Sequence, residues 1–225
     1  MKMMKSYTWS ICAALLILVS CGAPAENKSE ETPGAKADAK NTESIAFEDG
    51  KYQIDTENSI VNWRGTEITG KFHVGTASVY KGTIKITDQR FEAKLTVDMQ
   101  SIQCTDQNMR EGAKENLVGH LKSDDFFGVD AYPYARLVIA DGKMDEAKAY
   151  ANGKITVRDV TRPIEFPLSL RMENGKLIGD AQLTFNRADH NVKFRSGAFP
   201  DLFPDLGDKL INDEIELDVH IEAMK

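Results

Sequence analysis

Apolar and polar residues alternate one by one along three long segments of the chain. Apolar side chains occupy every second position in residues 91–99, 164–172 and 215–223, and most positions between them are polar. A period of two is typical of strands that have one buried face and one face in water. We therefore predict three half-buried strands in these segments.

Shorter runs with the same character bring the predicted number of strands to about nine. These runs cover residues 60–63, 71–76, 80–87, 135–140, 148–157 and 177–187. Turn residues separate many of the strands, at Thr87-Asp88, Asp141-Gly142, Asn152-Gly153, Arg158-Asp159 and Asn174-Gly175. Strands joined by such short turns are antiparallel neighbours, and a sheet of eight or nine strands tends to close because closure removes its exposed edges. The pattern predicts an all-β fold with a closed antiparallel sheet.

One segment departs from the period of two. Ala113, Leu117, Val118 and Leu121 follow each other at helical spacing. This spacing predicts one short amphipathic helix among the strands. A helix beside one end of a barrel can act as a lid.

The first residues have the character of an export signal. Lys2 and Lys5 form a basic head, and the apolar run 11–19 is too short to cross a bilayer as a mature helix. The run ends in Leu18-Val19-Ser20-Cys21, which is similar to a bacterial lipobox. We expect residues 1–20 to be a lipoprotein signal peptide and Cys21 to be acylated, which would hold the protein at a membrane. The alternative is an ordinary secretory signal with a chance cysteine.

The segment after Cys21 differs in composition from the rest. Residues 22–47 are rich in Ala, Glu, Asn, Lys, Ser, Thr and Pro and have almost no large apolar side chains. Such a segment cannot bury enough surface to offset the entropy of ordering. We interpret residues 21–47 as the acylated cysteine with a flexible tether, and residues 48–225 as one folded domain.

Charge and cysteine content narrow the classes of function. The net charge of the 225 residues is −7, and it becomes −9 when Lys2 and Lys5 leave with the signal. An acidic domain does not suit nucleic-acid binding, which needs a clustered basic face. Cys104 would be the one cysteine of the folded domain, so it has no disulfide partner there, and we favour a small buried residue over a nucleophile.

The residue types of catalytic and metal sites do not form a recognisable set. His73, His120, His190 and His220 lack the spacing of a zinc site, and Asp201, Asp205 and Asp208 lack the dense oxygen pattern of a calcium loop. Asp189-His190 offers half of an acid–base pair, but no nucleophile elbow accompanies it. We therefore expect no cofactor, no metal and no enzymatic activity.

A tandem repeat interrupts the strand pattern before the last strand. Phe199-Pro200-Asp201-Leu202 is followed by Phe203-Pro204-Asp205-Leu206. The two prolines exclude a regular strand or helix interior. The repeat fits either a connection that plugs one barrel end or a flap over a bound ligand.

Four groups of residues together resemble one family. They are Ser101-Ile102, the run from His120 to Phe127 followed by Tyr132-Pro133, the run 153–157 leading into Thr161-Arg162-Pro163, and Asn186-Arg187-Ala188-Asp189. In this order the chain resembles the YceI-like family of exported polyisoprenoid- and lipid-binding proteins, from about residue 52 to residue 223. It departs from the family pattern at Asp159, where we expect Gly, and in the longer, more apolar segment 196–210.

The resemblance implies an extended lipocalin-like barrel whose lumen holds an isoprenoid or other long-chain lipid. A barrel of about eight strands is either filled by its own side chains or has room for one small ligand. The apolar residues that we expect to line a lumen are Trp63, Ile84, Leu95, Val97, Leu117, Leu121, Phe126, Phe127, Leu137, Phe166, Leu168, Phe185, Phe199 and Phe203.

Three hypotheses of function remain open. The first is a lipid-binding lipoprotein of the bacterial cell envelope, facing the periplasm or on the outer membrane, and held to its membrane by Cys21. The second is an envelope protein-interaction module with a solid barrel. The third is an enzyme that modifies the bound lipid through His120 or His190. A homodimer is compatible with each of them.

Overall fold

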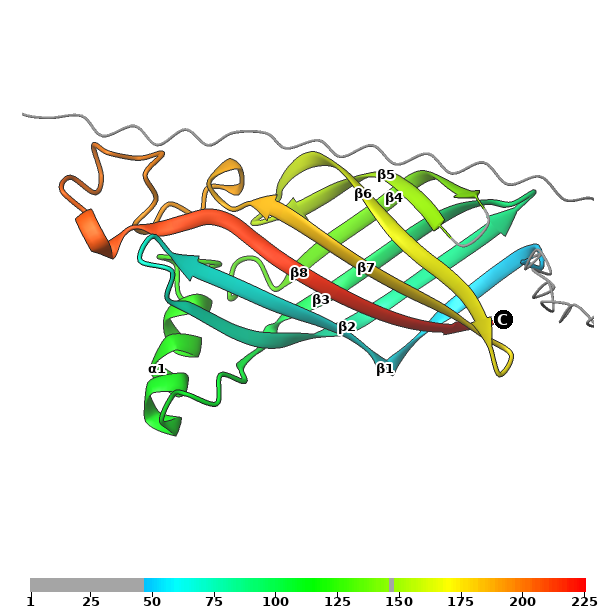
Figure 1. The fold of residues 1–225 in the computed structure, drawn as a ribbon, viewed down its shortest axis with the longest axis horizontal. Helices are drawn as coiled ribbons and strands as arrows, with labels where there is room; N and C mark the ends of the chain where they lie inside the picture. Colours follow the sequence, from blue (N-terminus) through cyan, green and yellow to red (C-terminus); the bar gives the residue numbers. More distant parts are fainter. Residues whose placement is uncertain (1–46, 146–147) are drawn as a thin grey trace, which may run out of the picture. The chain divides into compact units, whose positions relative to one another are not determined.

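The computed structural model describes residues 47–145 and 148–225. The predicted signal peptide, Cys21 and almost all of the predicted tether lie outside these residues. Eight antiparallel strands form a closed barrel in which each strand pairs with its neighbours in the chain (Figure 1). This architecture confirms the predicted antiparallel barrel with one helix. In chain order the elements are β1 (Gly50–Glu67), β2 (Phe72–Thr87), β3 (Arg90–Cys104), α1 (Glu111–Lys122), β4 (Tyr134–Asp145), β5 (Lys148–Val157), β6 (Val160–Glu173), β7 (Lys176–Asn186), η1 (Ala188–His190), η2 (Gly207–Lys209) and β8 (Ile211–Met224).

Strand β2 accounts for the difference between eight strands and the predicted nine. The sequence pattern indicated separate strands at 71–76 and 80–87, but β2 runs through both segments. Ala77 and Val79 are buried and Ser78 between them is exposed, so the period of two continues through the junction. The register with β3 shifts between Thr76 and Lys81, which marks bulges that bend the strand without ending it.

Three of the predicted turns are two-residue hairpin turns, one of them a residue later than the predicted Thr87-Asp88. Both central residues have positive φ at Asp88-Gln89, Arg158-Asp159 and Asn174-Gly175, as a type I′ turn requires. Asp159, at φ 57°, therefore occupies the left-handed position at which Gly was expected. The departure from the family pattern changes the residue and keeps the hairpin.

Two other predicted turns were wrong, because their glycines lie inside strands. Asp141 pairs with Asn152 and Gly142 pairs with Ala151 in the β4–β5 ladder. A Cβ at Gly142 would lie 2.2 Å from the ring of Phe91, and one at Gly153 would lie 2.6 Å from the carbonyl oxygen of Val138. These glycines permit close approach of neighbouring atoms, which is the other common reason for Gly in a strand.

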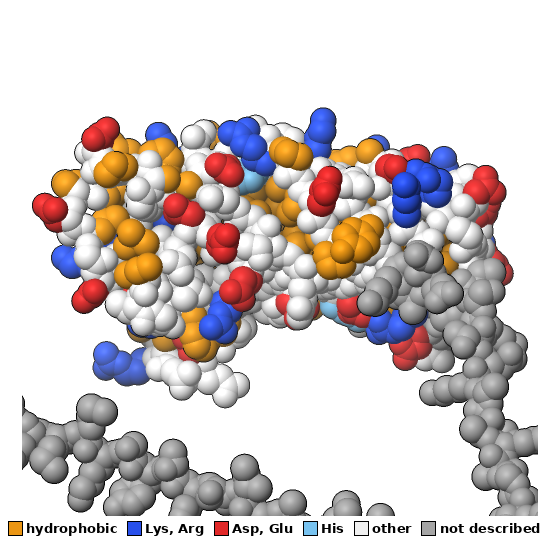
Figure 2. Space-filling model, turned by 45° about the horizontal axis from the view of Figure 1, so that its top comes forward, with side chains coloured by type: hydrophobic (Ala, Val, Ile, Leu, Met, Phe, Trp, Pro, Cys, Tyr) orange, Lys and Arg blue, Asp and Glu red, His pale blue; other side chains and the backbone are white. Residues whose placement is uncertain are grey.

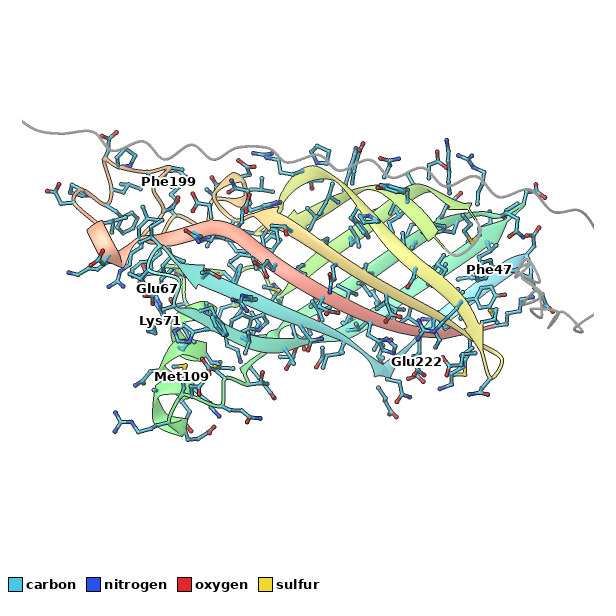
Figure 3. All side chains as sticks on the ribbon, viewed as in Figure 1. Phe47, Glu67, Lys71, Met109, Phe199 and Glu222 are labelled. Atoms are coloured by element: carbon cyan, nitrogen blue, oxygen red, sulfur yellow. The ribbon has the colours of Figure 1, made fainter. Side chains whose placement is uncertain are left out.

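The two ends of the barrel differ in packing. We call the end with the first residues of β1 and the last residues of β8 the packed end, where Tyr52, Ile86, Phe91 and Leu177 are almost completely buried. We call the opposite end the open end; it carries the β1–β2 turn, α1, the β5–β6 turn and the β7–β8 connection (Figure 1). Figure 3 shows Phe47 at the packed end and Glu67 and Lys71 at the open end.

A second cluster of buried residues holds the segment from α1 to β4 against the open end. Leu121 of α1 packs with Phe126 and Val129 from the following loop, and with Met99 and Ile102 of β3. Backbone hydrogen bonds close this loop, among them the Gly128 N–H to the Ser123 carbonyl at 2.8 Å. The helix is thus fixed beside the strands, as its apolar spacing predicted.

Charges of both signs are scattered over the outer surface. Figure 2 shows acidic and basic side chains interspersed with hydrophobic ones on the face in view. Within the described part of the chain, no helix combines the length and the apolar character needed to cross a bilayer.

Candidate ligand-binding cavity

A cavity of about 260 Å³ occupies the open half of the barrel. Strand residues whose side chains point inward form most of its wall, such as Val61 and Trp63 of β1 and Leu217 and Val219 of β8. Small residues contribute to the space, because Gly65, Ala77 and Ala135 stand where larger side chains would reach into the lumen. The packed half also contains small inward-facing residues such as Ala149 and Ala151, but bulky side chains fill the space beside them. The barrel is therefore solid at one end and hollow at the other.

Most of the residues expected to line a lumen lie in the wall of this cavity. They are Trp63, Leu95, Val97, Leu117, Leu121, Phe126, Phe127, Leu137 and Phe185. Ile84 and Phe166 are instead buried in the core of the barrel, with Leu168 packed against it, and none of the three contributes to the cavity wall. The inward-facing residues expected to line a lumen thus have two different environments: most line the cavity, and others are buried in the barrel core.

The Phe-Pro-Asp-Leu repeat lies in the β7–β8 connection at the open end, where Figure 3 labels Phe199. Neither Phe199 nor Phe203 lines the cavity. Phe203 packs its ring 5.7 Å from that of Phe194, and Phe194 does line the cavity. The repeat therefore supports the cavity wall from outside.

Sequence reasoning missed most of the polar groups of the wall and part of its apolar surface. The missed residues are Thr66, Glu67, His73, Arg136, Arg195, Phe194 and Ile211. His120, a candidate of the enzyme hypothesis, also lines the cavity. Thr66 and Glu67 lie at the end of β1, next to the β1–β2 turn. The alternation of inward and outward side chains along a strand does not identify which half of the barrel is hollow. Arg195 and Phe194 belong to the irregular connection, where no periodicity applies.

Arg187 organises the connection that forms this part of the wall. Its side chain has no solvent exposure, and its guanidinium donates hydrogen bonds to the carbonyl oxygens of Val192, Phe194, Ile211 and Asn212 at 2.9–3.1 Å. The same group lies 3.1 Å from the carboxylate of Asp213. The Asn186-Arg187-Ala188-Asp189 motif thus provides the buried cation that folds both ends of the connection inward.

A second arginine ties the β5–β6 turn to the loops at the open end. Nη1 of Arg158 donates to the carbonyl oxygen of Phe126 at 2.6 Å and to those of Asp124 and Asn191 at 3.2 and 3.3 Å. The type I′ turn at Arg158-Asp159 directs this side chain toward the loops. Phe126, in the most family-specific motif, is held by this bond and by its contact with the Arg187 guanidinium at 5.3 Å.

The four histidines have different surroundings. His73 lines the cavity, and its Nδ1 lies 3.1 Å from Oδ2 of Asp106. The backbone N–H of Asn108 and, to a smaller degree, the His73 ring lower the pKa of Asp106. His120 also lines the cavity and packs edge-on against Phe194, with ring centroids 4.4 Å apart.

The remaining two histidines lie outside the cavity lining. His190 is almost completely buried, its Nδ1 is 2.8 Å from the carbonyl oxygen of Val160, and burial lowers its pKa. His220 pairs with Asp180 on the outer surface, Nδ1 to Oδ1 at 2.6 Å. The Asp189-His190 pair considered for acid–base chemistry therefore has its histidine engaged with a backbone carbonyl.

The indole nitrogen of Trp63, a residue of the wall, is a buried polar atom without a hydrogen-bond partner. Nε1 is buried and makes no hydrogen bond within the described residues. Cys104, in contrast, is outside the lining, partly buried, with Sγ 3.9 Å from Sδ of Met109. In the part of the chain that the structure describes, no three His, Cys, Asp or Glu side chains come together as a metal site.

Curated proteins are similar to this chain in sequence over most of its length. A UPF0312 protein of Pseudomonas putida (strain GB-1) is 26% identical over 185 residues, covering 78% of this chain and 86% of that protein. A UPF0312 protein of Photorhabdus laumondii is 25% identical over 186 residues, covering 82% and 91%.

Two solved structures share the fold. BcnA of Burkholderia cenocepacia superposes with a TM-score of 0.58 at 17% identity, covering 75% of this chain and 98% of that one. A polyisoprenoid binding domain from Saccharophagus degradans, implicated in plant cell wall breakdown, gives a TM-score of 0.53 at 16% identity, covering 77% and 97%. The sequence profile of the YceI-like domain matches residues 52–223, almost the whole barrel. The chain therefore belongs to the YceI-like family.

Proposed function

We propose that this protein binds an isoprenoid or similar long-chain lipid in the cavity at the open end of its barrel. The observation that carries the proposal is the cavity itself, about 260 Å³ in volume and lined mainly by aliphatic and aromatic side chains. Burial of a lipid tail there is favourable by roughly 25 cal/mol per Å² of apolar surface removed from water. The solved relative from Saccharophagus degradans, described as a polyisoprenoid binding domain, supports the same ligand class.

We also propose that the protein is held in the bacterial cell envelope by lipid chains on Cys21. Residues 21–47 would then act as a tether between membrane and barrel. The support is the sequence Leu18-Val19-Ser20-Cys21 after a basic head and an apolar run. Replacing Cys21 with Ser should move the protein from the membrane fraction to the soluble fraction, and an unchanged distribution would contradict the anchor.

Lipid binding is tested by extracting the purified protein with organic solvent and identifying the extract by mass spectrometry. The variant Ala135→Phe places a ring in the cavity, since Ala135 lines it. Ala140→Phe is the matched control, because Ala140 is on the same strand and exposed. We expect lipid from the wild type and from Ala140→Phe, and much less from Ala135→Phe.

Two results would contradict lipid binding in the cavity. One is a wild-type protein that yields no lipid and takes up no added isoprenoid. The other is equal recovery from both Phe variants, with circular dichroism showing both folded. The alternative hypothesis, an envelope protein-interaction module, expected a barrel filled by its own side chains. Only the packed half of the barrel is filled in this way.

A further inference from the structure

Arg195 is a lining residue of the cavity whose charge is not balanced within the described part of the chain. Its side chain makes no hydrogen bond or ion pair there, and its guanidinium carbon lies 5.1 Å from the centre of the Phe194 ring, which also lines the cavity. The other ionisable residues of the lining each have a partner. They are Glu67 with Lys71 at 3.4 Å, His73 with Asp106 at 3.1 Å, His120 with Asp125 at 3.8 Å and Arg136 with Asp159 at 3.9 Å. The guanidinium of Arg195 is thus available to a ligand.

The local backbone gives no reason for an arginine at position 195. Arg195 has a φ of 50°, in the left-handed region that Gly and Asn adopt readily and long side chains rarely do. The surrounding turn fixes this conformation, because the Ile211 N–H donates to the carbonyl oxygen of Arg195 and the Ser196 N–H donates to that of Lys193, both at 3.0 Å. Backbone strain of this kind clusters at functional sites. The side chain, and not the turn, therefore accounts for the arginine.

Arg195 lies at the mouth of the cavity. It belongs to the β7–β8 connection, which is at the open end of the barrel (Figure 1), and it is partly exposed. Glu67, labelled at the same end in Figure 3, pairs with Ile211, the residue whose N–H is bonded to Arg195. Bulky side chains close the opposite end of the barrel. A lipid whose apolar tail fills the lumen therefore has its end group beside Arg195.

The ionic surroundings of Arg195 match a single negative charge. Lys71 offsets the charge of Glu67 on the neighbouring strand, so Arg195 leaves one positive charge uncompensated among these three residues. A carboxylate carries one negative charge, and its two oxygens match the parallel N–H groups of a guanidinium.

A phosphate ester fits the same place less well. It carries a charge of about −1.5 to −2 at neutral pH, which exceeds the single positive charge that Arg195 supplies. The excess negative charge would lose part of its water near the carboxylate of Glu67, which also lines the cavity, and this loss is unfavourable. The charges at the mouth thus favour a carboxylate over a phosphate.

We propose that Arg195 binds the end group of the lipid and selects a carboxylate, so that the preferred ligand is a long-chain lipid acid. The guanidinium donates hydrogen bonds to the two carboxylate oxygens at the mouth, and the apolar chain extends into the lumen. A neutral ester or alcohol leaves the cation without a counter-charge. This inference rests on the proposed binding of a lipid in the cavity.

The first test compares three ligands that share one isoprenoid tail. Isothermal titration calorimetry of the lipid-free protein measures its affinity for farnesoic acid, for the neutral ester methyl farnesoate and for farnesyl phosphate. We expect the acid to bind about tenfold more tightly than the ester, because hydrogen bonds between charged groups are stronger than those of neutral groups. Farnesyl phosphate should bind more weakly than the acid.

The second test repeats these titrations with variants of the cation. Arg195→Met keeps an unbranched apolar side chain and removes the charge, so it should abolish the preference for the acid and leave the affinity for the ester unchanged. Arg195→Lys keeps the charge without the parallel donors and should retain part of the preference. Lys193→Met is the control, because Lys193 is an exposed cation two residues away that does not line the cavity; it should retain the full preference.

A further variant keeps the test valid if Arg195→Met does not fold. Arg195→Gly removes the guanidinium and places at this position the residue that adopts a positive φ without steric cost. Its backbone is therefore under less strain than that of the wild type. We expect Arg195→Gly to fold, as checked by circular dichroism, and to bind the acid and the ester equally.

The outcomes separate the carboxylate site from lipid binding itself. Equal affinity of the wild type for the acid and the ester overturns the site and leaves lipid binding intact. So does an undiminished preference for the acid in Arg195→Gly, or tighter binding of farnesyl phosphate than of farnesoic acid by the wild type. A loss of preference in Lys193→Met as large as that in Arg195→Met would show a general effect of charge and also overturns the site. Failure of all three ligands to bind overturns the proposed function as well.

Discussion

Arg187 is the residue on which the cavity wall depends most. Its guanidinium binds four backbone carbonyls, which belong to residues 5 to 25 positions away in the chain. The sequence motif around Arg187 was apparent, but carbonyl partners have no side-chain identity and leave no pattern in a sequence. Sequence reasoning could therefore find the motif without finding what it does.

Replacing Arg187 with Met should lower the free energy of unfolding by about 3–5 kcal/mol. The variant leaves four carbonyl oxygens unpaired and Asp213 without its cation, and removing one partner of a buried pair has effects of this size. Urea denaturation measures the change. Arg162→Met is the control, because Arg162 is exposed and donates only to its neighbour Thr161. A similar small loss in both variants would contradict the role given to Arg187.

At the scale of elements, charged side chains on the outer face connect strands β1, β6, β7 and β8. Nζ of Lys176 lies 2.7 Å from Oε2 of Glu222 and 3.7 Å from Oδ2 of Asp55. Asp180 of β7 accepts hydrogen bonds from Arg171 of β6 and His220 of β8. Alternation assigned Arg171, His220 and Glu222 to the face in water, and pairing of the strands brings the opposite charges together.

Asp180 should contribute to the acid sensitivity of the barrel. Burial acts to raise its pKa, but hydrogen bonds from Arg171 and His220 outweigh burial and lower it. A carboxyl group with a lowered pKa in the folded state stabilises that state above its unfolded pKa of about 4 and loses this effect as the pH falls through the folded value. The variant Asp180→Asn should be less stable than the wild type at neutral pH, and it should lose less stability than the wild type on acidification.

Urea denaturation between neutral pH and the acid range measures this difference. Asp218→Asn is a suitable control, because Asp218 is an exposed residue of the neighbouring strand β8. It should follow the wild-type profile. The role of Asp180 would be contradicted if the free energy of unfolding of Asp180→Asn fell on acidification as steeply as that of the wild type.

At the scale of the whole barrel, the division into a packed and an open half sets how much each core residue matters. Leu177 of β7 is completely buried at the packed end, whereas Leu217 of β8 borders the cavity and is partly buried. Both positions carry the same residue on an inward face. The alternation pattern does not distinguish the two leucines. Their different burial arises from the side chains that face them across the barrel.

Truncation of these two leucines should have unequal effects on stability. Leu177→Ala opens a new void among packed side chains and should cost about 4 kcal/mol, while Leu217→Ala enlarges an existing space and should cost about 2 kcal/mol. Chemical denaturation of the lipid-free protein measures both values. Equal losses would indicate that the open half is as tightly packed as the other.

The sequence by itself determined the antiparallel barrel, a helix around residues 113–121 and the hairpins at Arg158-Asp159 and Asn174-Gly175, because these depend on local periodicity and on turn residues. It also identified many residues of the cavity wall, among them Trp63 and Phe185, since the alternation along a single strand shows which side chains face inward. Only the tertiary structure decided that Gly142 and Gly153 lie within strands and that Phe199 and Phe203 lie outside the cavity. It also decided that Ile84 and Phe166 fill the core while Leu95 and Leu137 line a space. The physical reason is that a void depends on the volumes of side chains that face each other across the barrel, and those residues are far apart in the chain.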